Sequence, residues 1–242
     1  METKLFFHMG PGFHANIERD LYGEKFPNVH FWNQPKVLTF TDLVNSAQSK
    51  INELNPKTLV AHSFGAQIVM SVVEKSPSVK EIIFLNSGYD PFECFLNMAN
   101  HIPEQQMDVE KAKKLRSCNT QSKMEFIFRL ATDPKFPLLY WTSMEKMIQH
   151  QDIFSRNLQL EISVFAGVFS DYLENKHRVI PDNIHWKGKS TVLFSKDDVL
   201  LDSAKDIEPW KARFPQSKII SLCNVGHYSH IENLDVAKMI FL

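Results

Sequence analysis

The sequence predicts an α/β protein built on a parallel sheet with helices on both faces. Two features predict this class. Short apolar runs alternate with helical patterns in 1–88 and again in 186–242. An apolar run at 58–61 turns through small residues directly into a helical run at 68–73. The stretch between the two alternating parts, 89–185, contains helical patterns and few strands, so we expect it to be an inserted subdomain.

Composition limits the class further. The chain has 242 residues, of which 43% are hydrophobic and 23% are charged, as in one globular domain with a large core. The net charge of −1 offers no general attraction for nucleic acid. The three cysteines, Cys94, Cys118 and Cys223, form neither a metal-ligand pattern nor a disulfide framework. This favours a reducing compartment, and we expect a cytoplasmic protein.

The first residues lack the length of a signal peptide and fit a strand better. No run approaches the roughly 18 apolar residues that a membrane span needs. The strand at 4–8 leads into a loop dense in glycine and proline, His8-Met9-Gly10-Pro11-Gly12. The remaining expected strands are short and apolar, and they lie at 28–32, 58–61, 79–85, 190–195 and 217–222.

Helical spacing fills the gaps between these strands. The segment that begins at Thr41-Asp42 has apolar residues three or four positions apart and stops before Pro56. The expected core helices are 17–26, 41–54, 68–73, 204–214 and 234–242. Strands joined in this way need right-handed crossovers and a parallel sheet that is covered on both faces.

The insertion at 89–185 is rich in aromatic residues and methionine at helical spacing. Its expected helices are 92–100, 104–116, 122–131, 138–150 and 153–175. Most of these apolar stripes pack against one another. An insertion between two strands must lie at the edge or rim of the sheet, however, so part of its apolar surface can line a pocket.

Three residues with complementary chemistry follow predicted strands. Ser63 comes after 58–61, Asp198 after 190–195 and His227 after 217–222. The carboxyl ends of parallel strands share one edge of a sheet, where ligands bind. A serine hydroxyl becomes a nucleophile when a histidine takes its proton, and a buried carboxylate orients and stabilises that histidine. We therefore expect a Ser63-Asp198-His227 catalytic triad.

The anion that forms during such an attack needs hydrogen-bond donors in place. We expect the backbone N–H groups of Phe64 and Gly10 to supply them. Asp197 is the alternative to Asp198 as the acid, and the other aspartate would then serve a turn or cap. His8 is expected to brace the loop at Gly10.

These segments resemble the α/β-hydrolase-fold serine hydrolases over nearly the whole chain. The resemblance rests on His8-Met9-Gly10-Pro11-Gly12, Ala61-His62-Ser63-Phe64-Gly65, Phe194-Ser195-Lys196-Asp197-Asp198 and the Gly226-His227 to Glu232 ending. The first is similar to the loop of proline-iminopeptidase-like members, and the order Ser, Asp, His is that of the family. The resemblance implies the α/β-hydrolase fold with about six strands, favours Asp198 as the acid and makes 89–185 a helical cap, or lid.

The chain also departs from the family pattern. Ala61 replaces the first glycine of the turn around Ser63, Met9 replaces a glycine of the loop after the first strand, and Ser195 replaces a glycine before the acid. We expect Met9 in that position to narrow the pocket for the acyl group. None of these changes removes a member of the triad, and a serine nucleophile argues against epoxide or haloalkane hydrolysis.

The aromatic and methionine-rich cap favours an apolar acyl chain, so we expect a carboxylesterase that works through an acyl-enzyme and needs no cofactor or metal. We expect Met9, His62, Tyr140 and Trp141 to line the pocket; His62 and His230 would also form local hydrogen bonds. The alternatives are an acyl thioesterase, a carbon–carbon bond hydrolase, an aminopeptidase and a ligand-binding protein that has lost turnover.

A basic run in the cap allows one more specific alternative. Lys111, Lys113, Lys114 and Arg116 could dock an acidic acyl carrier protein, as in the pimeloyl-carrier-protein methyl ester esterases that share this fold and triad. A solvated helix face is the simpler interpretation of the same residues.

Overall fold

A six-stranded, all-parallel sheet forms the centre of the computed structural model, which describes residues 2–242. The strand order is β2-β1-β3-β4-β5-β6, as expected for about six strands. The strands are β1 (Lys4–Phe7), β2 (Val29–Phe31), β3 (Thr58–His62), β4 (Glu81–Leu85), β5 (Lys189–Ser195) and β6 (Lys218–Leu222). The chain moves outward from β1 to β2 and then crosses back to β3. The sheet order therefore reverses beside β1 and β3, and ligands bind at such points in open parallel sheets.

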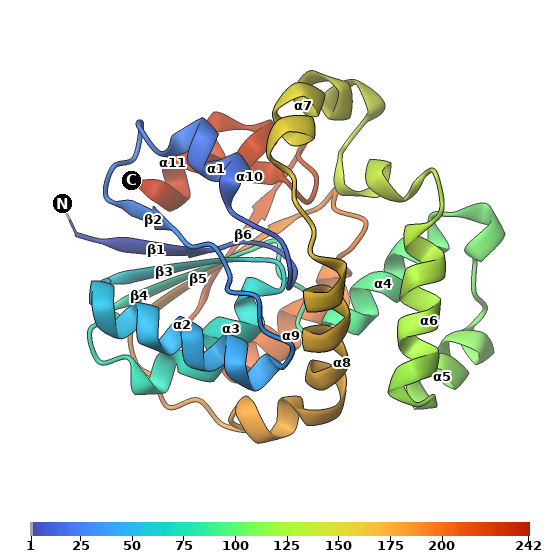
Figure 1. The fold of residues 1–242 in the computed structure, drawn as a ribbon, viewed down its shortest axis with the longest axis horizontal. Coiled ribbons are helices and arrows are strands. Elements are labelled where there is room, and N and C mark those ends of the chain that lie inside the picture. The colour runs from blue at the N-terminus through green and yellow to red at the C-terminus, as the bar shows by residue number, and fades with distance from the viewer. Residues whose placement is uncertain (1) are drawn as a thin grey trace.

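Alternate residues of each strand face opposite sides of the sheet, and both sides are buried. In β4, Ile82 and Phe84 belong to one apolar cluster, while Ile83 and Leu85 belong to another. Figure 1 shows α1 (Asn16–Tyr22), α10 (Ser229–Glu232) and α11 (Leu234–Phe241) on one face of the sheet. The opposite face is covered by α2 (Phe40–Leu54), α3 (Gly65–Val72) and α9 (Ser203–Arg213).

Helices fill the whole stretch between β4 and β5. They are α4 (Pro91–Asn100), α5 (Val109–Ser117), α6 (Thr120–Ala131), α7 (Met144–Asn157) and α8 (Ile162–Val179), with short 3₁₀ turns at Pro103–Gln105 and Phe136–Tyr140. In Figure 1, α4, α5 and α6 project from one end of the sheet, and α8 lies between them and the core. None of the described helices combines the length and apolar character that a membrane crossing needs.

Two expected insertion helices are divided differently in the structure. The helix predicted over 153–175 is interrupted between α7 and α8. There Leu160 forms an antiparallel bridge with Phe13, and the Glu161 N–H donates to the carbonyl of Gly12. The segment predicted as one helix over 138–150 is a 3₁₀ turn followed by α7, which begins at a Ser143 cap. Contacts with distant loops thus outweigh the local apolar spacing.

Candidate active site

Ser63 occupies a sharp turn between β3 and α3. Its φ angle is +54°, in the left-handed region that residues other than glycine rarely adopt. Hydrogen bonds hold the turn: the Ser63 N–H donates to the Leu85 carbonyl at 3.1 Å, and the Ala66 N–H donates to the Ser63 carbonyl at 3.1 Å. The side chain is partly exposed although its neighbours in the chain are buried. Backbone strain that the surrounding structure maintains in this way is typical of functional sites.

Gly65 allows α3 to pack closely against the first strand. A Cβ atom at this position would lie 2.6 Å from the carbonyl oxygen of Phe7 and 3.0 Å from its Cβ. Any larger residue would push the start of α3, and with it the turn at Ser63, away from β1. The second glycine of the predicted serine motif is thus explained by packing.

Asp198 and His227 form a buried pair at the carboxyl ends of β5 and β6. His227 Nδ1 lies 2.7 Å from Asp198 Oδ2, and both side chains are at most 1% exposed. The other carboxylate oxygen accepts the Leu200 N–H at 3.0 Å. Because an ionised carboxylate only accepts hydrogen bonds, Nδ1 carries the proton and Nε2 keeps its lone pair.

The neighbouring Asp197 has a different partner. Its Oδ2 atom accepts the N–H of Asn224 at 2.7 Å, which ties the loop after β5 to the loop after β6. Of the two aspartates that the sequence left open, Asp198 is therefore the one that contacts His227.

Ser63 and His227 are linked through their surroundings rather than directly. His62, the residue before Ser63, has its Nε2 2.9 Å from the His227 carbonyl oxygen, and the two imidazole rings are 4.9 Å apart. His227 Nε2 is buried and has no hydrogen-bond partner among the described residues, so the bond from Ser63 Oγ is not formed in this structure. Such bonds often form only when substrate is bound.

The loop after β1 approaches Ser63 from the other side. Gly10 has a φ angle of +57°, and a Cβ atom there would lie 2.7 Å from the ring of Phe13. Buried Gln34 holds this loop: its amide nitrogen donates to the Gly10 carbonyl at 3.0 Å, and its amide oxygen accepts the Gly12 N–H at 3.2 Å. Nothing in the local sequence singled out Gln34, because its partners lie more than 20 positions away.

A cavity opens beside Ser63. Its lining combines residues from the sheet loops with residues of α4 and α8: Met9, Gly10, Pro11, Phe13, Ser63, Phe64, Gly88, Pro91, Cys94, Phe95, Met98, Tyr140, Phe165, Phe169 and Leu200. These residues include no acidic or basic side chain. The cavity therefore suits an apolar, uncharged group.

Two of the four expected pocket residues line this cavity and two do not. Met9 and Tyr140 are lining residues. His62 is fully buried behind the turn, where its ring packs on His227 and His230. Trp141 points the other way and stacks on His150 at 5.4 Å. Neighbouring positions in an irregular segment face different sides, which explains why the prediction holds for Tyr140 but not for Trp141.

Solved structures align along nearly the whole chain. A proline iminopeptidase-related protein from Thermus thermophilus has a TM-score of 0.68 and 19% identity over 99% of this chain and 88% of its own. The corresponding values for a serine hydrolase from Cycloclasticus zankles are 0.63, 12%, 99% and 88%. Those for MenH from S. aureus are 0.60, 15%, 98% and 91%. The chain has the α/β-hydrolase fold.

At these identities the likeness concerns the α/β-hydrolase fold alone. No protein-family model matches the chain, and no curated protein matches it at a significant level. The chemistry of this chain must therefore be argued from its own side chains.

Asn86 joins the loops that carry the candidate residues, and the sequence analysis did not identify it. Its amide nitrogen donates to the carbonyls of Gly226 and His227 at 2.9 and 3.0 Å, and its amide oxygen accepts the Ser195 N–H at 2.9 Å. It follows β4 directly and has a φ angle of +43°. A polar residue straight after a buried strand was the only local signal.

The helical insertion also holds the His227 loop. The His227 N–H donates to the Tyr140 carbonyl at 2.9 Å. Glu232 accepts the Gly226 N–H at 2.9 Å with one oxygen and the Thr142 hydroxyl at 2.6 Å with the other. We call this arrangement of Tyr140, Thr142 and Glu232 the insertion clamp. It couples the position of the insertion to that of the candidate base.

Thr142→Val is expected to lower the free energy of unfolding by about 1.5–3 kcal/mol, because it removes a hydrogen bond to a charged, mostly buried carboxylate. Urea denaturation measures this loss. Thr132→Val is the matched control, because both threonines are exposed but the Thr132 hydroxyl donates at 2.7 Å to the nearby Arg129 carbonyl and not to a distant carboxylate. Equal effects in the two variants would contradict a role for the clamp.

His8 lies at the end of β1 and is 1% exposed. Its Nδ1 donates to the Met9 carbonyl at 2.6 Å, which fits its expected role in bracing the loop. Burial lowers the pKa of His8 to about 4, because the charged imidazolium would lose its hydration.

Since the unfolded chain binds a proton at His8 below about pH 6.5, while the folded chain resists it down to about pH 4, acid should destabilise the protein. Through His8 alone, the free energy of unfolding should fall by about 2 kcal/mol between pH 7 and pH 5. Urea denaturation across this range should show a shallower pH dependence in His8→Gln. The exposed control His101→Gln should keep the wild-type dependence; the same slope in His8→Gln as in wild type would refute the assignment.

Proposed function

We propose that this protein is a serine hydrolase that cleaves a carboxylic ester with an apolar acyl group. The observation that carries the proposal is the buried contact of 2.7 Å between His227 and Asp198, next to the strained turn of Ser63. The pairing leaves a lone pair on His227 Nε2, which is the form of imidazole that can accept a proton. The apolar cavity beside Ser63 supports an ester with little polarity in its acyl part.

In the first half of the reaction, the Ser63 oxygen attacks the ester carbonyl carbon and its proton passes to His227 Nε2. This requires the Ser63 hydroxyl to turn toward Nε2 when substrate binds. Asp198 stabilises the imidazolium through Nδ1. The N–H groups of Phe64 and Gly10, which both belong to cavity-lining residues, would hold the carbonyl oxygen as it becomes negative. Collapse then expels the alcohol, which takes the proton from His227, and leaves the acyl group on Ser63.

In the second half, water attacks the acyl-enzyme while His227 Nε2 removes one of its protons. The second tetrahedral intermediate breaks the bond to Ser63, and the serine oxygen regains its proton from His227. The products are a carboxylic acid, an alcohol and the unchanged enzyme. The helical insertion 89–185 would serve as the cap, because residues of α4 and α8 line the cavity.

The cavity favours an ester over the substrate of an aminopeptidase. A free amino group would need an acidic partner in the pocket, and the lining residues include none. A thioester or a carbon–carbon bond would use the same three residues, so turnover of acyl thioesters and of β-diketones should be compared with turnover of esters.

The test is labelling with a fluorophosphonate probe, followed by mass spectrometry of the peptide that contains Ser63. We expect the added mass on that peptide in wild type, no labelling in Ser63→Ala, and hydrolysis of p-nitrophenyl esters with a preference for apolar acyl chains. No labelling and no turnover of any ester or thioester, in folded protein, would overturn the proposal in favour of a non-catalytic ligand-binding protein.

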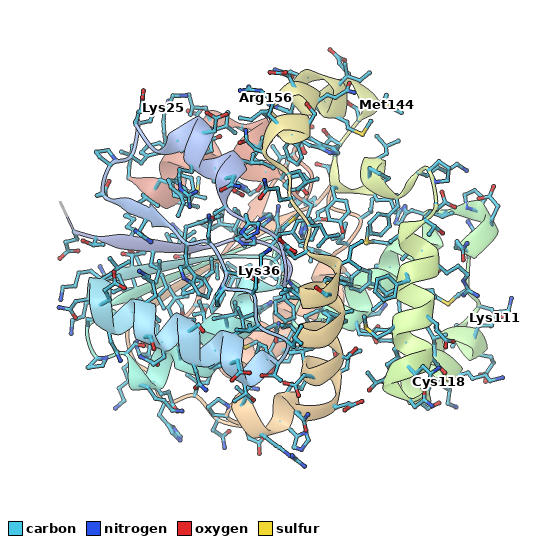
Figure 2. The ribbon with its side chains drawn as sticks, in the orientation of Figure 1. Lys25, Lys36, Lys111, Cys118, Met144 and Arg156 are labelled. Carbon is cyan, nitrogen blue, oxygen red and sulfur yellow. The ribbon has the colours of Figure 1, made fainter. Side chains whose placement is uncertain are left out.

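Docking of an acidic acyl carrier protein is the more specific version of this function. Lys111, Lys113 and Lys114 are exposed on α5, and Figure 2 shows Lys111 at the outer edge of the insertion. Arg116 is already engaged, since its guanidinium binds both oxygens of Glu93 at 2.6 and 2.8 Å. Three cations near one end of the cap therefore remain to attract such a partner.

Reversing the charge of Lys113 and Lys114 to Glu is expected to raise KM for a carrier-bound acyl ester about tenfold or more and to leave a small ester unaffected, because only the larger substrate would contact α5. Steady-state kinetics with both substrates measures the difference. The matched control is Lys187→Glu with Lys189→Glu, which changes the net charge equally at the opposite edge of the sheet. Equal changes for both substrates would refute docking.

A further inference from the structure

A cluster of ionisable side chains lies behind the candidate active site and outside its cavity. It consists of Glu18 on α1, His62 at the end of β3 and His230 on α10. One ligand atom from each residue lies within 4.8 Å of one from each of the others. All three side chains are buried, with exposed fractions of 4%, 0% and 0%. Charged and polar groups at this depth need partners.

Each imidazole of the cluster has one nitrogen occupied and one free. His62 Nε2 lies 2.9 Å from the His227 carbonyl oxygen, and His230 Nε2 lies 3.2 Å from Glu18 Oε1. Both acceptors lack a proton to donate, so both histidines carry their proton on Nε2. The Nδ1 atoms of His62 and His230 therefore keep lone pairs, and both are buried without a hydrogen-bond partner among the described residues.

For His62 this is the pattern that metal-binding histidines show. A ligating imidazole holds the ion with one nitrogen and donates its other N–H to a backbone carbonyl or a carboxylate, which fixes the ring and its tautomer. His62 has the carbonyl on Nε2, which leaves Nδ1 for the ion. On His230 the ion would replace the hydrogen bond between Nε2 and Glu18 Oε1, whose separation of 3.2 Å is close to that of two ligand atoms around one zinc ion.

We propose that Glu18, His62 and His230 form a structural binding site for a divalent transition-metal ion of the zinc type. Two histidines and one carboxylate are a ligand set that zinc accepts. Ligand atoms around one zinc ion lie about 3.4 Å apart, so ligand atoms up to 4.8 Å apart would have to close by up to roughly 1.4 Å. His8 Nε2 is likewise buried without a hydrogen-bond partner among the described residues, but His8 is not part of this cluster.

An ion at this site would join three parts of the chain that are distant in sequence. His230 and Glu18 are 212 positions apart, and His62 lies on a third element. Through the N–H of His62, the ion would also hold the backbone of His227 in place. The proposal does not depend on hydrolase activity, since none of its residues lines the cavity.

The test uses the full chain, treated with a chelator and then titrated with Zn²⁺ alone in a calorimeter. We expect one ion per chain with a Kd in about the micromolar range or tighter. Thermal denaturation should show Tm rising by roughly 5–10 °C when free Zn²⁺ exceeds Kd by about 100-fold. Co²⁺ in place of Zn²⁺ should give visible absorption bands. Failure of folded wild-type protein to bind would overturn the proposal and favour a buried water molecule that donates to the two lone pairs.

Variants locate the ion. His230→Gln and Glu18→Gln are each expected to weaken Zn²⁺ affinity at least tenfold. His150→Gln is the matched control, because His150 Nε2 is likewise buried without a partner among the described residues but lies on α7. The Zn²⁺ affinity of this variant should equal that of wild type. Unchanged affinity in Glu18→Gln, or loss of binding in His227→Gln, would place the ion elsewhere and overturn the proposal. Circular dichroism shows whether each variant is folded. If His230→Gln is not folded, the Zn²⁺ affinities of Glu18→Gln and wild type are compared instead.

Discussion

Ser63→Ala is expected to lower kcat/KM for an ester substrate by about 10⁴–10⁶-fold. The hydroxyl would form the covalent bond to the acyl group, so without it the reaction is left with binding and the oxyanion donors alone. Serine and alanine both carry a Cβ atom, so the cost of the positive φ angle at position 63 should be similar in wild type and Ser63→Ala, and we expect similar free energies of unfolding. Initial rates on the best p-nitrophenyl ester, with urea denaturation as a check on folding, measure both effects.

Ser71→Ala is the control for this experiment. Ser71 is a buried serine on α3, and its hydroxyl donates to the Gln67 carbonyl at 2.8 Å, away from the cavity lining. It should retain turnover within a factor of about two to three. If Ser63→Ala kept more than about a tenth of wild-type kcat/KM, Ser63 would not be the nucleophile.

Asp198→Asn is expected to lower kcat by about 10⁴-fold, while Asp197→Asn keeps it within a few-fold. An amide N–H at position 198 would face His227 Nδ1 and force the imidazole proton onto Nε2, which could then no longer accept the proton of Ser63. Asp197 instead accepts the Asn224 N–H, so its replacement should cost about 1 kcal/mol of stability and little activity. Comparison of kcat and urea midpoints for the two variants separates these roles, and a larger activity loss in Asp197→Asn would reverse the assignment.

The positions of the strands along the chain and their parallel pairing followed from local patterns. Buried strands such as 58–62 are short apolar runs, and each is followed by small or polar residues that stop it. Because parallel strands place their carboxyl ends at one edge, residues that follow those strands, such as Asp198 and His227, could be expected near one another from their positions only. In the structure, His227 Nδ1 lies 2.7 Å from Asp198 Oδ2.

Local patterns failed where distant segments decide the conformation. The apolar spacing of 153–175 fits a single helix, yet Glu161 and Leu160 bond to the loop at Gly12 and Phe13, and the helix is interrupted there. The same reason applies to Gln34, which stabilises the loop of Gly10 from 24 positions away. Helical or strand periodicity cannot detect long-range hydrogen bonds of this kind.

The sequence by itself determined the α/β class, the order of the elements and the kinds of side chain at the carboxyl ends of the strands, since each depends on residues close together in the chain. Only the tertiary structure decided which aspartate contacts His227, that Thr142 and Glu232 tie the insertion to its loop, and that Glu18, His62 and His230 are buried together. The physical reason is that such contacts depend on how distant elements pack, and hydrophobic periodicity records which face of an element is buried without recording its partner.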